Sequence, residues 1–254
     1  MIKRTVIKIS GEALSGAGKM PENSGGAFCD TTINGIGRQI RAALDSGTEI
    51  ALVVGGGNFW RGRGTNSKMR VKADQIGMLA TVMNALYLSE VFKNHGIDSV
   101  VMTPMPIGNM TTLFDKDTAL ELMSRGTVTF HAAGLGHPFF STDTVTALRG
   151  LELGVDCVLY TKNGVGGVYD KDPESCSDAK RYKSLPYSVA ITGQLEFADI
   201  AAMHLLAQSG VPAFIFGLDE PDGIVRACDS PSGFGTWLHT TAKEEFYVNA
   251  YENL

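Results

Sequence analysis

The sequence is poor in the residue patterns that mark several large classes of protein. Its four cysteines include no C-x-x-C pair, so they fit neither a zinc site nor a disulfide framework. No segment approaches the roughly 18 apolar residues of a membrane span. The N-terminus alternates like a strand and lacks the apolar run of a signal peptide. We therefore expect a protein of the reducing cytoplasm with no membrane partner.

Positive charge is not in excess either. Lys and Arg number 22 against 27 Asp and Glu, which gives a net charge of −5. Such a balance argues against a broad surface for DNA or RNA, whose phosphates are held by clustered cations. A pocket for one nucleotide needs only a few cations and backbone N–H groups, so a nucleotide ligand is compatible with this composition.

The familiar phosphate-binding motifs are absent. Gly18-Lys19 resembles part of a P-loop, but Ala13 stands in place of its first glycine and Met20 in place of Ser or Thr. No G-x-G-x-x-G follows an expected strand, and the H-R-D and D-F-G triplets of protein kinases are missing. Any phosphoryl chemistry must therefore use a different scaffold.

What the sequence does contain is a regular alternation of β-rich runs and helical stretches. Hydrophobic residues make up 44% of the 254 positions, enough for the core of one sizeable domain. The alternation predicts an α/β fold with a doubly wound, mainly parallel sheet and helices on both faces. Leu14–Ala27 and Asp170–Pro186 are expected to be exposed loops. The expected strands are Thr5–Ser10, Glu49–Val54, Ser99–Met102, Thr127–His131, Val155–Tyr160 and Ala213–Phe216, and the expected helices are Asp30–Ser46 (with Asp30 as N-cap), Lys72–Asn94 and Phe197–Gln208.

A lysine, Lys8, lies near the end of the first expected strand. Ligand sites in such a sheet gather at the carboxyl ends of the strands. After Lys8 comes Ile9-Ser10-Gly11, a flexible turn that can bring backbone N–H groups to phosphate oxygens while the lysine supplies positive charge. An edge lysine followed by an ordinary turn is the alternative, and this segment alone does not decide between the two.

The second strand is followed by a run of glycines. Gly55-Gly56-Gly57 come directly after Ile50–Val54, and Arg61 follows them closely. Each glycine costs roughly 0.5–1 kcal/mol in regular structure, so the run indicates a backbone that approaches a ligand, usually an oxyanion. Arg61 would neutralise this anion. A glycine-rich bend with a solvated arginine is the alternative.

Three later segments have residues suited to a nucleotide. Segment 133–143 combines glycines, a proline and two phenylalanines with a Ser-Thr-Asp helix start, which suits a base beside a helix or is simply a capped loop. Segment 162–173 offers Tyr169 to an adenine and Asp172 to ribose hydroxyls, or is a surface turn. Asp199, at the start of an apolar helix, is most simply a contact with the helix dipole.

Taken together, these segments resemble the bacterial UMP kinases of the amino-acid-kinase superfamily, whose fold is an αβα sandwich. They occur in the order of that family and extend over residues 4 to 240. The strings that carry the resemblance are K-I-S-G-E-A-L at 8–14, G-G-G-N at 55–58, D-Q-I-G-M-L-A-T-V-M-N at 74–84, P-F-F-S-T-D at 138–143, A-L-R-G at 147–150 and G-V-Y-D-K-D-P at 167–173.

The resemblance implies an activity: transfer of the γ-phosphoryl group of ATP to UMP, in pyrimidine nucleotide biosynthesis. Mg²⁺ would accompany ATP, and no metal ligand from the protein is implied. It also implies a homo-oligomer, typically a hexamer, built from one domain. Residues 1–150 would bind UMP and residues 151–240 ATP, and 241–254 would extend past the usual end of the family.

The resemblance also implies roles for single residues. No general base is needed, because UMP with a second pKa of about 6 is already an anionic nucleophile at pH 7. Asp199 would orient the lysines. Catalysis is implied for Lys8, Arg61, Asp199 and Lys162, ATP contacts for Lys8, Ile9, Ser10, Gly11, Gly57, Arg61, Asn163, Tyr169 and Asp172, and UMP contacts for Gly56, Asp74, Leu135, Gly136, His137, Pro138, Phe139, Phe140, Ser141 and Thr142.

The chain departs from the family pattern in two of these loops. Leu135 and His137 replace the usual Thr and Asn beside the uracil, and Gly166 replaces the usual Asp in the ATP loop. Two other functions stay open at this point: another small-molecule kinase of the same fold, or a non-catalytic oligomer that binds nucleotides or oxyanions. Lys8, Arg61 and Asp199 together favour catalysis.

Overall fold

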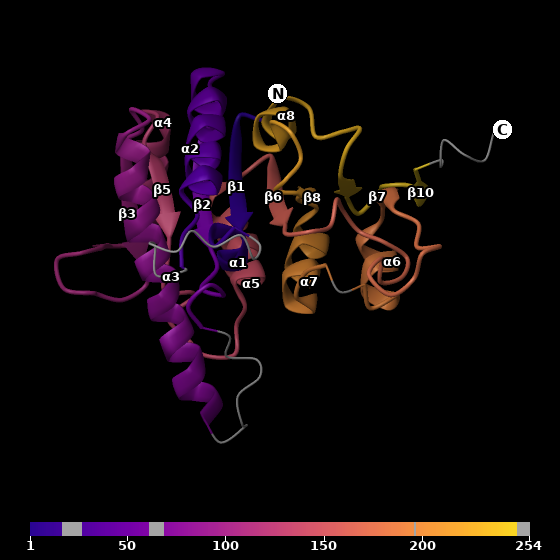
Figure 1. Cartoon of the computed structure of the whole chain (residues 1–254), viewed down its shortest axis with the longest axis horizontal. Coiled ribbons are helices and arrows are strands. Elements are labelled where there is room, and N and C mark those ends of the chain that lie inside the picture. The colour runs from indigo at the N-terminus through magenta and orange to yellow at the C-terminus, as the bar shows by residue number, and fades with distance from the viewer. Residues whose placement is uncertain (17–26, 61–68, 196, 248–254) are drawn as a thin grey trace.

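The fold is built on one twisted sheet, seen in a computed structural model that describes residues 1–16, 27–60, 69–195 and 197–247 (Figure 1). Its strands are β1 (Arg4–Ile9), β2 (Glu49–Val54), β3 (Ser99–Thr103), β4 (Thr112–Leu113), β5 (Val128–His131), β6 (Cys157–Lys162), β7 (Tyr182–Leu185), β8 (Ala213–Gly217), β9 (Thr236–Leu238) and β10 (Glu245–Phe246). In the described residues they form a 10-stranded sheet in the order β10-β7-β9-β8-β6-β1-β2-β5-β3-β4. The central strands from β8 to β3 pair in parallel, and antiparallel pairing occurs between β8 and β9 and between β10 and β7.

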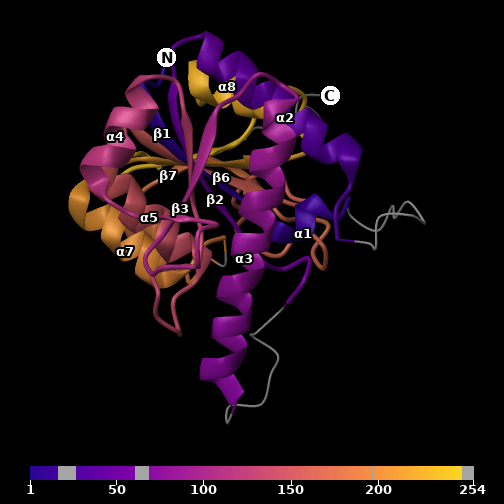
Figure 2. The ribbon, with the colours of Figure 1, turned by 90° about the vertical axis from the view of Figure 1, so that its left-hand side faces the viewer.

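Helices cover both faces of this sheet (Figure 2). They are α1 (Gly11–Leu14), α2 (Asp30–Asp45), α3 (Arg70–Lys93), α4 (Lys116–Ser124), α5 (Thr142–Leu153), α6 (Tyr187–Thr192), α7 (Ile200–Ser209) and α8 (Gly223–Asp229). The predicted α/β class, with a mainly parallel sheet between two helical layers, is confirmed.

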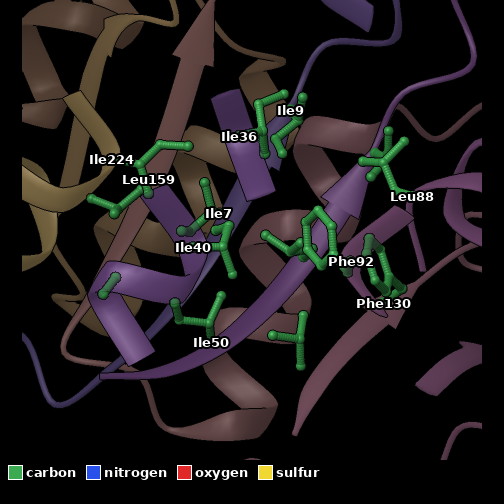
Figure 3. Close-up of a cluster of buried hydrophobic side chains, with 14 of the residues drawn as sticks. Ile7, Ile9, Ile36, Ile40, Ile50, Leu88, Phe92, Phe130, Leu159 and Ile224 are labelled. Atoms are coloured by element: carbon green, nitrogen blue, oxygen red, sulfur yellow. The ribbon is translucent and has the colours of Figure 1, made fainter. Parts of the chain in front are cut away.

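Each face of the sheet has its own hydrophobic core. On one face, α2, α3 and α8 pack on the sheet, and Figure 3 shows Ile40, Phe92 and Ile224 from these helices against Ile7 and Phe130 of the strands. On the other face, α4 to α7 pack on the alternate strand residues. Parallel strands covered on both sides must be apolar along their whole length. This is why Ile50–Val54 forms a continuous apolar run, in which every residue is buried.

The six predicted strands are confirmed, with boundaries that move by no more than two residues. Two local predictions are wrong. The N-cap of α2 is Cys29 and not Asp30. Cys29 has an extended backbone, whereas Asp30 is already the first residue of the helix. Asp170–Pro186 is not wholly a loop, because Tyr182–Leu185 forms β7 beside β9. Most of the other predicted loop, Leu14–Ala27, lies outside the described residues.

No helix of the described ranges is both long enough and apolar enough to span a membrane.

Candidate active site

The carboxyl ends of β1 and β2 lie side by side and bring Lys8 next to the glycine run. Lys8 is in register with Val53 of β2 and Tyr160 of β6, and the Gly55 N–H donates to the Ile9 carbonyl at 2.9 Å. A Cβ atom on Gly11 would lie only 2.4 Å from the Gly55 carbonyl oxygen and 2.6 Å from the Gly57 nitrogen. The two turns therefore touch through their backbones, which only glycine permits at position 11.

Helix α3 holds the same glycine loop from the other side. A Cβ atom on Gly56 would lie 2.9 Å from both Ala80 Cβ and the Gly77 carbonyl oxygen. The buried Asn84 amide donates to the Gly55 carbonyl at 2.6 Å and exchanges hydrogen bonds with Asn58. Because these polar groups are satisfied inside the fold, the loop has one defined position.

Lys8 pairs with an acid on α5. Its Nζ lies 3.2 Å from Asp143 Oδ1, and the two side chains are only 12% and 14% exposed. Burial raises the pKa of Asp143, but Lys8, Lys162 and a hydrogen bond from the Asp199 backbone outweigh it, so the pKa lies below its ordinary value. Asp143 is therefore an ionised carboxylate that contacts Lys8 and is further stabilised by the charge of Lys162.

Asp199 links α5 to α7. It is the N-cap of α7, where its side chain accepts a hydrogen bond from the Ala201 N–H. Its Oδ2 accepts from Ser141 Oγ at 2.8 Å and Thr144 Oγ1 at 3.0 Å, and its own N–H donates to Asp143 Oδ2 at 3.3 Å. Asp199 thus fixes the start of α5, and through it the carboxylate that contacts Lys8.

A pocket of about 450 Å³ adjoins the end of β6. We call it the large pocket. Three of the residues expected at ATP or in catalysis line it: Lys162, Tyr169 and Asp172. The rest of the lining is both apolar and polar, with Val165, segment 167–173, segment 193–195 and Phe197. Its mixed apolar and polar lining suits a flat base with a polar sugar.

A second pocket, of about 140 Å³, lies between the glycine loop, α3 and the segment before α5. We call it the small pocket. Five residues expected at UMP line it, namely Gly56, Asp74, His137, Phe140 and Thr142. Asp74 accepts hydrogen bonds from Arg70 on its own helix and from the Phe139 N–H, both at 2.8 Å. This second bond holds Phe139 at a φ of +72°, a strained value for that residue type.

The other predicted residues have different positions. Leu135 is half-buried and packs against one of the two cores, Gly136 lies against Pro104, and the Ser141 hydroxyl donates to Asp199. Phe139 is 62% exposed, with Arg70 over its ring at 5.4 Å. Ile9 is the last residue of β1, Ser10 links the strand to α1, and Gly11 is the first residue of α1. Pro138 and Asn163 are not among the residues that line either pocket in the described ranges. Arg61 lies outside the described residues.

Three residues of this site were not identified from the sequence: Asp143, Asn84 and Trp60. Asp143 and Asn84 belong to two of the family strings, at 138–143 and 74–84. Their neighbours in the sequence do not distinguish them from an ordinary acid in the first turn of a helix and an ordinary core amide. Trp60 lines the small pocket, and its indole Nε1 is buried with no hydrogen-bond partner in the described structure. A buried donor of this kind normally has a partner.

Comparison with known proteins agrees with this geometry. The model of the amino acid kinase family matches residues 3–217. The chain is similar to the solved UMP kinase of Bacillus anthracis, with 30% identity, a TM-score of 0.88 and coverage of 97% of this chain and 99% of that one. It is also similar to the UMP kinase of Ureaplasma parvum, with 28% identity, a TM-score of 0.83 and coverage of 94% and 99%.

A third solved structure, the uridylate kinase of Archaeoglobus fulgidus, shares the fold at 22% identity and a TM-score of 0.65, over 92% of this chain and 99% of that one. Because the family match spans residues 3–217, most of its length, this chain belongs to the amino acid kinase family.

Proposed function

We propose that this chain is a UMP kinase, which transfers the γ-phosphoryl group of ATP to UMP and releases UDP and ADP. The observation that carries the proposal is the buried ion pair of Lys8 with Asp143, because residues close to Asp143 line both pockets. Lys162 lines the large pocket and lowers the pKa of Asp143, while Thr142, the neighbour of Asp143 in the chain, lines the small pocket. A kinase that transfers a phosphoryl group between two nucleotides needs a pocket for each of them and positive charge close to the transferred group.

The large pocket takes ATP and the small pocket UMP. Tyr169 and Asp172 suit the adenosine, and Asp74 suits the UMP ribose because its carboxylate lines the small pocket. Residues 1–150 then form the UMP part and 151–240 the ATP part of one domain. His137 takes the place usual for Asn beside the uracil and lines this pocket, so uracil selection rests on it in this chain.

Catalysis rests on positioning and on charge. The UMP phosphate is already anionic at pH 7 and needs no base. Lys8 and the N–H groups of the glycine turns stabilise the charge that develops on the moving phosphoryl group, as such donors do in other phosphoryl transfers. Asp143 keeps the Lys8 ammonium directed into the site. Arg61 is expected to add charge at the phosphates.

Magnesium enters as part of the ATP substrate. Mg²⁺ prefers phosphate oxygens and water to an all-protein cage. Within the described ranges, no three His, Cys, Asp or Glu side chains gather as a metal site. In this proposal the lysines and glycine amides act on a nucleotide whose phosphate oxygens hold the metal ion.

The functional form is a cytoplasmic homo-oligomer, a hexamer by family resemblance. Ile76, Leu79 and Met83 lie along one side of α3 and are 43%, 54% and 51% exposed. The N-terminal half of α3 projects beyond the body of the molecule (Figure 2). An apolar stripe on a projecting helix suits burial against a second copy. Leu79→Asp, followed by analytical ultracentrifugation, should reduce the assembly, and an unchanged mass contradicts this contact.

The test of the function is a coupled ADP-release assay with the four ribonucleoside monophosphates, N-acetylglutamate and isopentenyl phosphate. UMP should be the preferred acceptor, and turnover of either of the last two compounds without UMP turnover contradicts the proposal. Lys8→Ala should lower kcat by about 10²–10³, as for loss of one transition-state donor. Lys93→Ala removes an exposed lysine paired with Glu90 and serves as the matched control. Full activity of Lys8→Ala contradicts the mechanism and supports a non-catalytic binder.

A further inference from the structure

The C-terminal end of the described chain forms β10, the last strand at one edge of the sheet, next to β7 (Figure 1). In β10, Phe246 pairs with Tyr182 of β7, and their rings stack with centroids 4.2 Å apart. The next residue, Tyr247, donates from its N–H to the Arg181 carbonyl at 3.0 Å and from its hydroxyl to the Gly235 carbonyl at 2.8 Å. This terminal segment, 245–247, is therefore held both by its backbone and by its side chains.

Arg181 connects the terminal segment to the loop that follows β6. Its guanidinium lies 4.3 Å from the centre of the Tyr247 ring, and its Nη1 donates to the Gly166 carbonyl at 3.3 Å. A Cβ atom on Gly166 would lie 2.6 Å from Nη1, and one on Gly167 would lie 3.2 Å from Arg181 Cδ. A side chain at position 166 would meet the end of the Arg181 side chain and displace it, so Gly166, a departure from the family pattern, leaves room for the guanidinium at this carbonyl.

The same loop forms a wall of the large pocket. Gly167, Val168 and Tyr169 all line it. Tyr169 forms an isolated antiparallel bridge with Arg181, and the Val168 carbonyl accepts from the Tyr182 N–H at 2.8 Å. The wall is therefore bonded to residues 181 and 182, and those residues are bonded in turn to 246 and 247. This chain of contacts runs from the end of the described residues to the pocket without a gap.

We propose that Arg181 and Tyr247 are positioning residues for the nucleotide of the large pocket. The terminal segment holds the Arg181 guanidinium against Gly166, and Arg181 fixes the loop on which Tyr169 is carried. Neither residue needs to touch the nucleotide. The identity of this nucleotide as ATP rests on the proposed function.

The proposal predicts an effect on ATP that is separate from the effects on UMP and on the chemical step. Tyr247→Leu removes the ring from Arg181, and Arg181→Met removes the guanidinium. Each should raise the KM for ATP about threefold to tenfold, the range expected for loss of one partly buried cation–π contact. The KM for UMP and kcat should change less than twofold. Tyr247→Phe is the matched control, because it keeps the ring over Arg181 and loses only the hydroxyl bond to Gly235.

The variants are measured in the full-length protein by steady-state kinetics with each substrate varied, and by calorimetric titration with a non-hydrolysable ATP analogue. The double variant should show no more than the larger of the two single effects, because both act through one contact. An unchanged affinity for the analogue in both Tyr247→Leu and Arg181→Met overturns the proposal, as does an equal rise in both KM values with a fall in kcat. If Tyr247→Leu does not fold, the test is the affinity of Arg181→Met for the analogue, compared with that of the control Tyr247→Phe. Absence of UMP turnover by the wild type contradicts the proposed function alone, because the analogue titration does not depend on turnover.

Discussion

Lys8 Nζ and Asp143 Oδ1 lie 3.2 Å apart at the carboxyl edge of the sheet, where both side chains are largely buried. Asp143 Oδ1 has no hydrogen bond of good geometry in the described structure, so the pair is a close charge contact without full alignment. A buried pair of this kind adds little to stability, because removing two charges from water costs about as much as their attraction returns. We therefore expect the pair to contribute to catalysis, by directing the Lys8 side chain and keeping it charged, more than to stability.

Asp143→Asn tests this relationship. The variant keeps the shape of the side chain but leaves Lys8 without its counter-charge, so the ammonium is no longer held toward the phosphates. We expect kcat to fall on the order of 10²-fold, as for loss of transition-state charge stabilisation, with little change in the KM for UMP. Steady-state kinetics measure both constants. Asp45→Asn, which removes an exposed partner of Arg41, is the control and should be silent. Wild-type kcat in Asp143→Asn would show that Lys8 does not need this acid.

Gly11→Ala tests the contact between the two turns. The new Cβ would meet the Gly55 carbonyl and the Gly57 nitrogen, both backbone atoms that cannot move without moving the loop. We expect loss of activity, since Gly56 of this loop lines the small pocket and a shift of the loop would also displace the turn that follows Lys8.

The matched substitution is Gly35→Ala, on the surface of α2, where the nearest atom would be the end of Arg38 at 4.0 Å. It should raise the free energy of unfolding by roughly 0.5–1 kcal/mol, because alanine favours a helix interior. Urea denaturation and the ADP-release assay are measured on both variants. An active Gly11→Ala contradicts the close approach.

His131 makes stability depend on pH. It is 4% exposed at the end of β5, and burial, with a smaller effect from Arg149, lowers its pKa from 6.5 to about 3. The native state therefore keeps the ring neutral while the unfolded chain binds a proton below pH 6.5. Stability from this residue is complete above pH 6.5 and is lost as the pH falls towards 3, by about 2 kcal/mol at pH 5.

Urea denaturation at pH 7.5 and pH 5 measures this loss. His131→Gln should lose less stability over this interval than the wild type, whereas His204→Gln, on the exposed side of α7, should follow the wild type. Parallel curves for the wild type and His131→Gln contradict the burial argument.

Trp60 should report binding in the small pocket. Its unpaired indole N–H is a donor only, so an oxygen of the bound nucleotide is the partner that fits. The chain has only two tryptophans, and Trp237→Phe leaves Trp60 as the one indole. We expect UMP to change the fluorescence of that variant.

The complementary variant Trp60→Phe keeps Trp237 and should give no response to UMP. It should also raise the KM for UMP about tenfold, as for loss of a hydrogen bond to a charged acceptor. Titration with uridine and with inorganic phosphate distinguishes the part of the nucleotide that is bound. No change in fluorescence or in KM would show that the indole faces away from the ligand.

Much of the fold follows from local patterns. Ile50–Val54 is apolar along its whole length because helices cover both faces of the parallel strands. Such a continuous apolar run can be recognised in the sequence itself. The short edge strands are different. Tyr182–Leu185 is a strand because it pairs with β9 and β10, and Glu245–Phe246 is a strand because it pairs with β7. Both segments are too short for their alternation of apolar and polar residues to predict a strand.

The sequence by itself determined the α/β class, the glycine turns at the strand ends and the expected Lys8 at their centre, because these depend on apolar periodicity and on backbone freedom. Only the tertiary structure decided which acid meets Lys8, what holds the glycine loop and what the C-terminal extension touches. Asp143, Asn84 and Arg181 act through partners far away in the chain. No local pattern encodes such partners, since a contact between distant residues exists only after the helices have packed on the sheet.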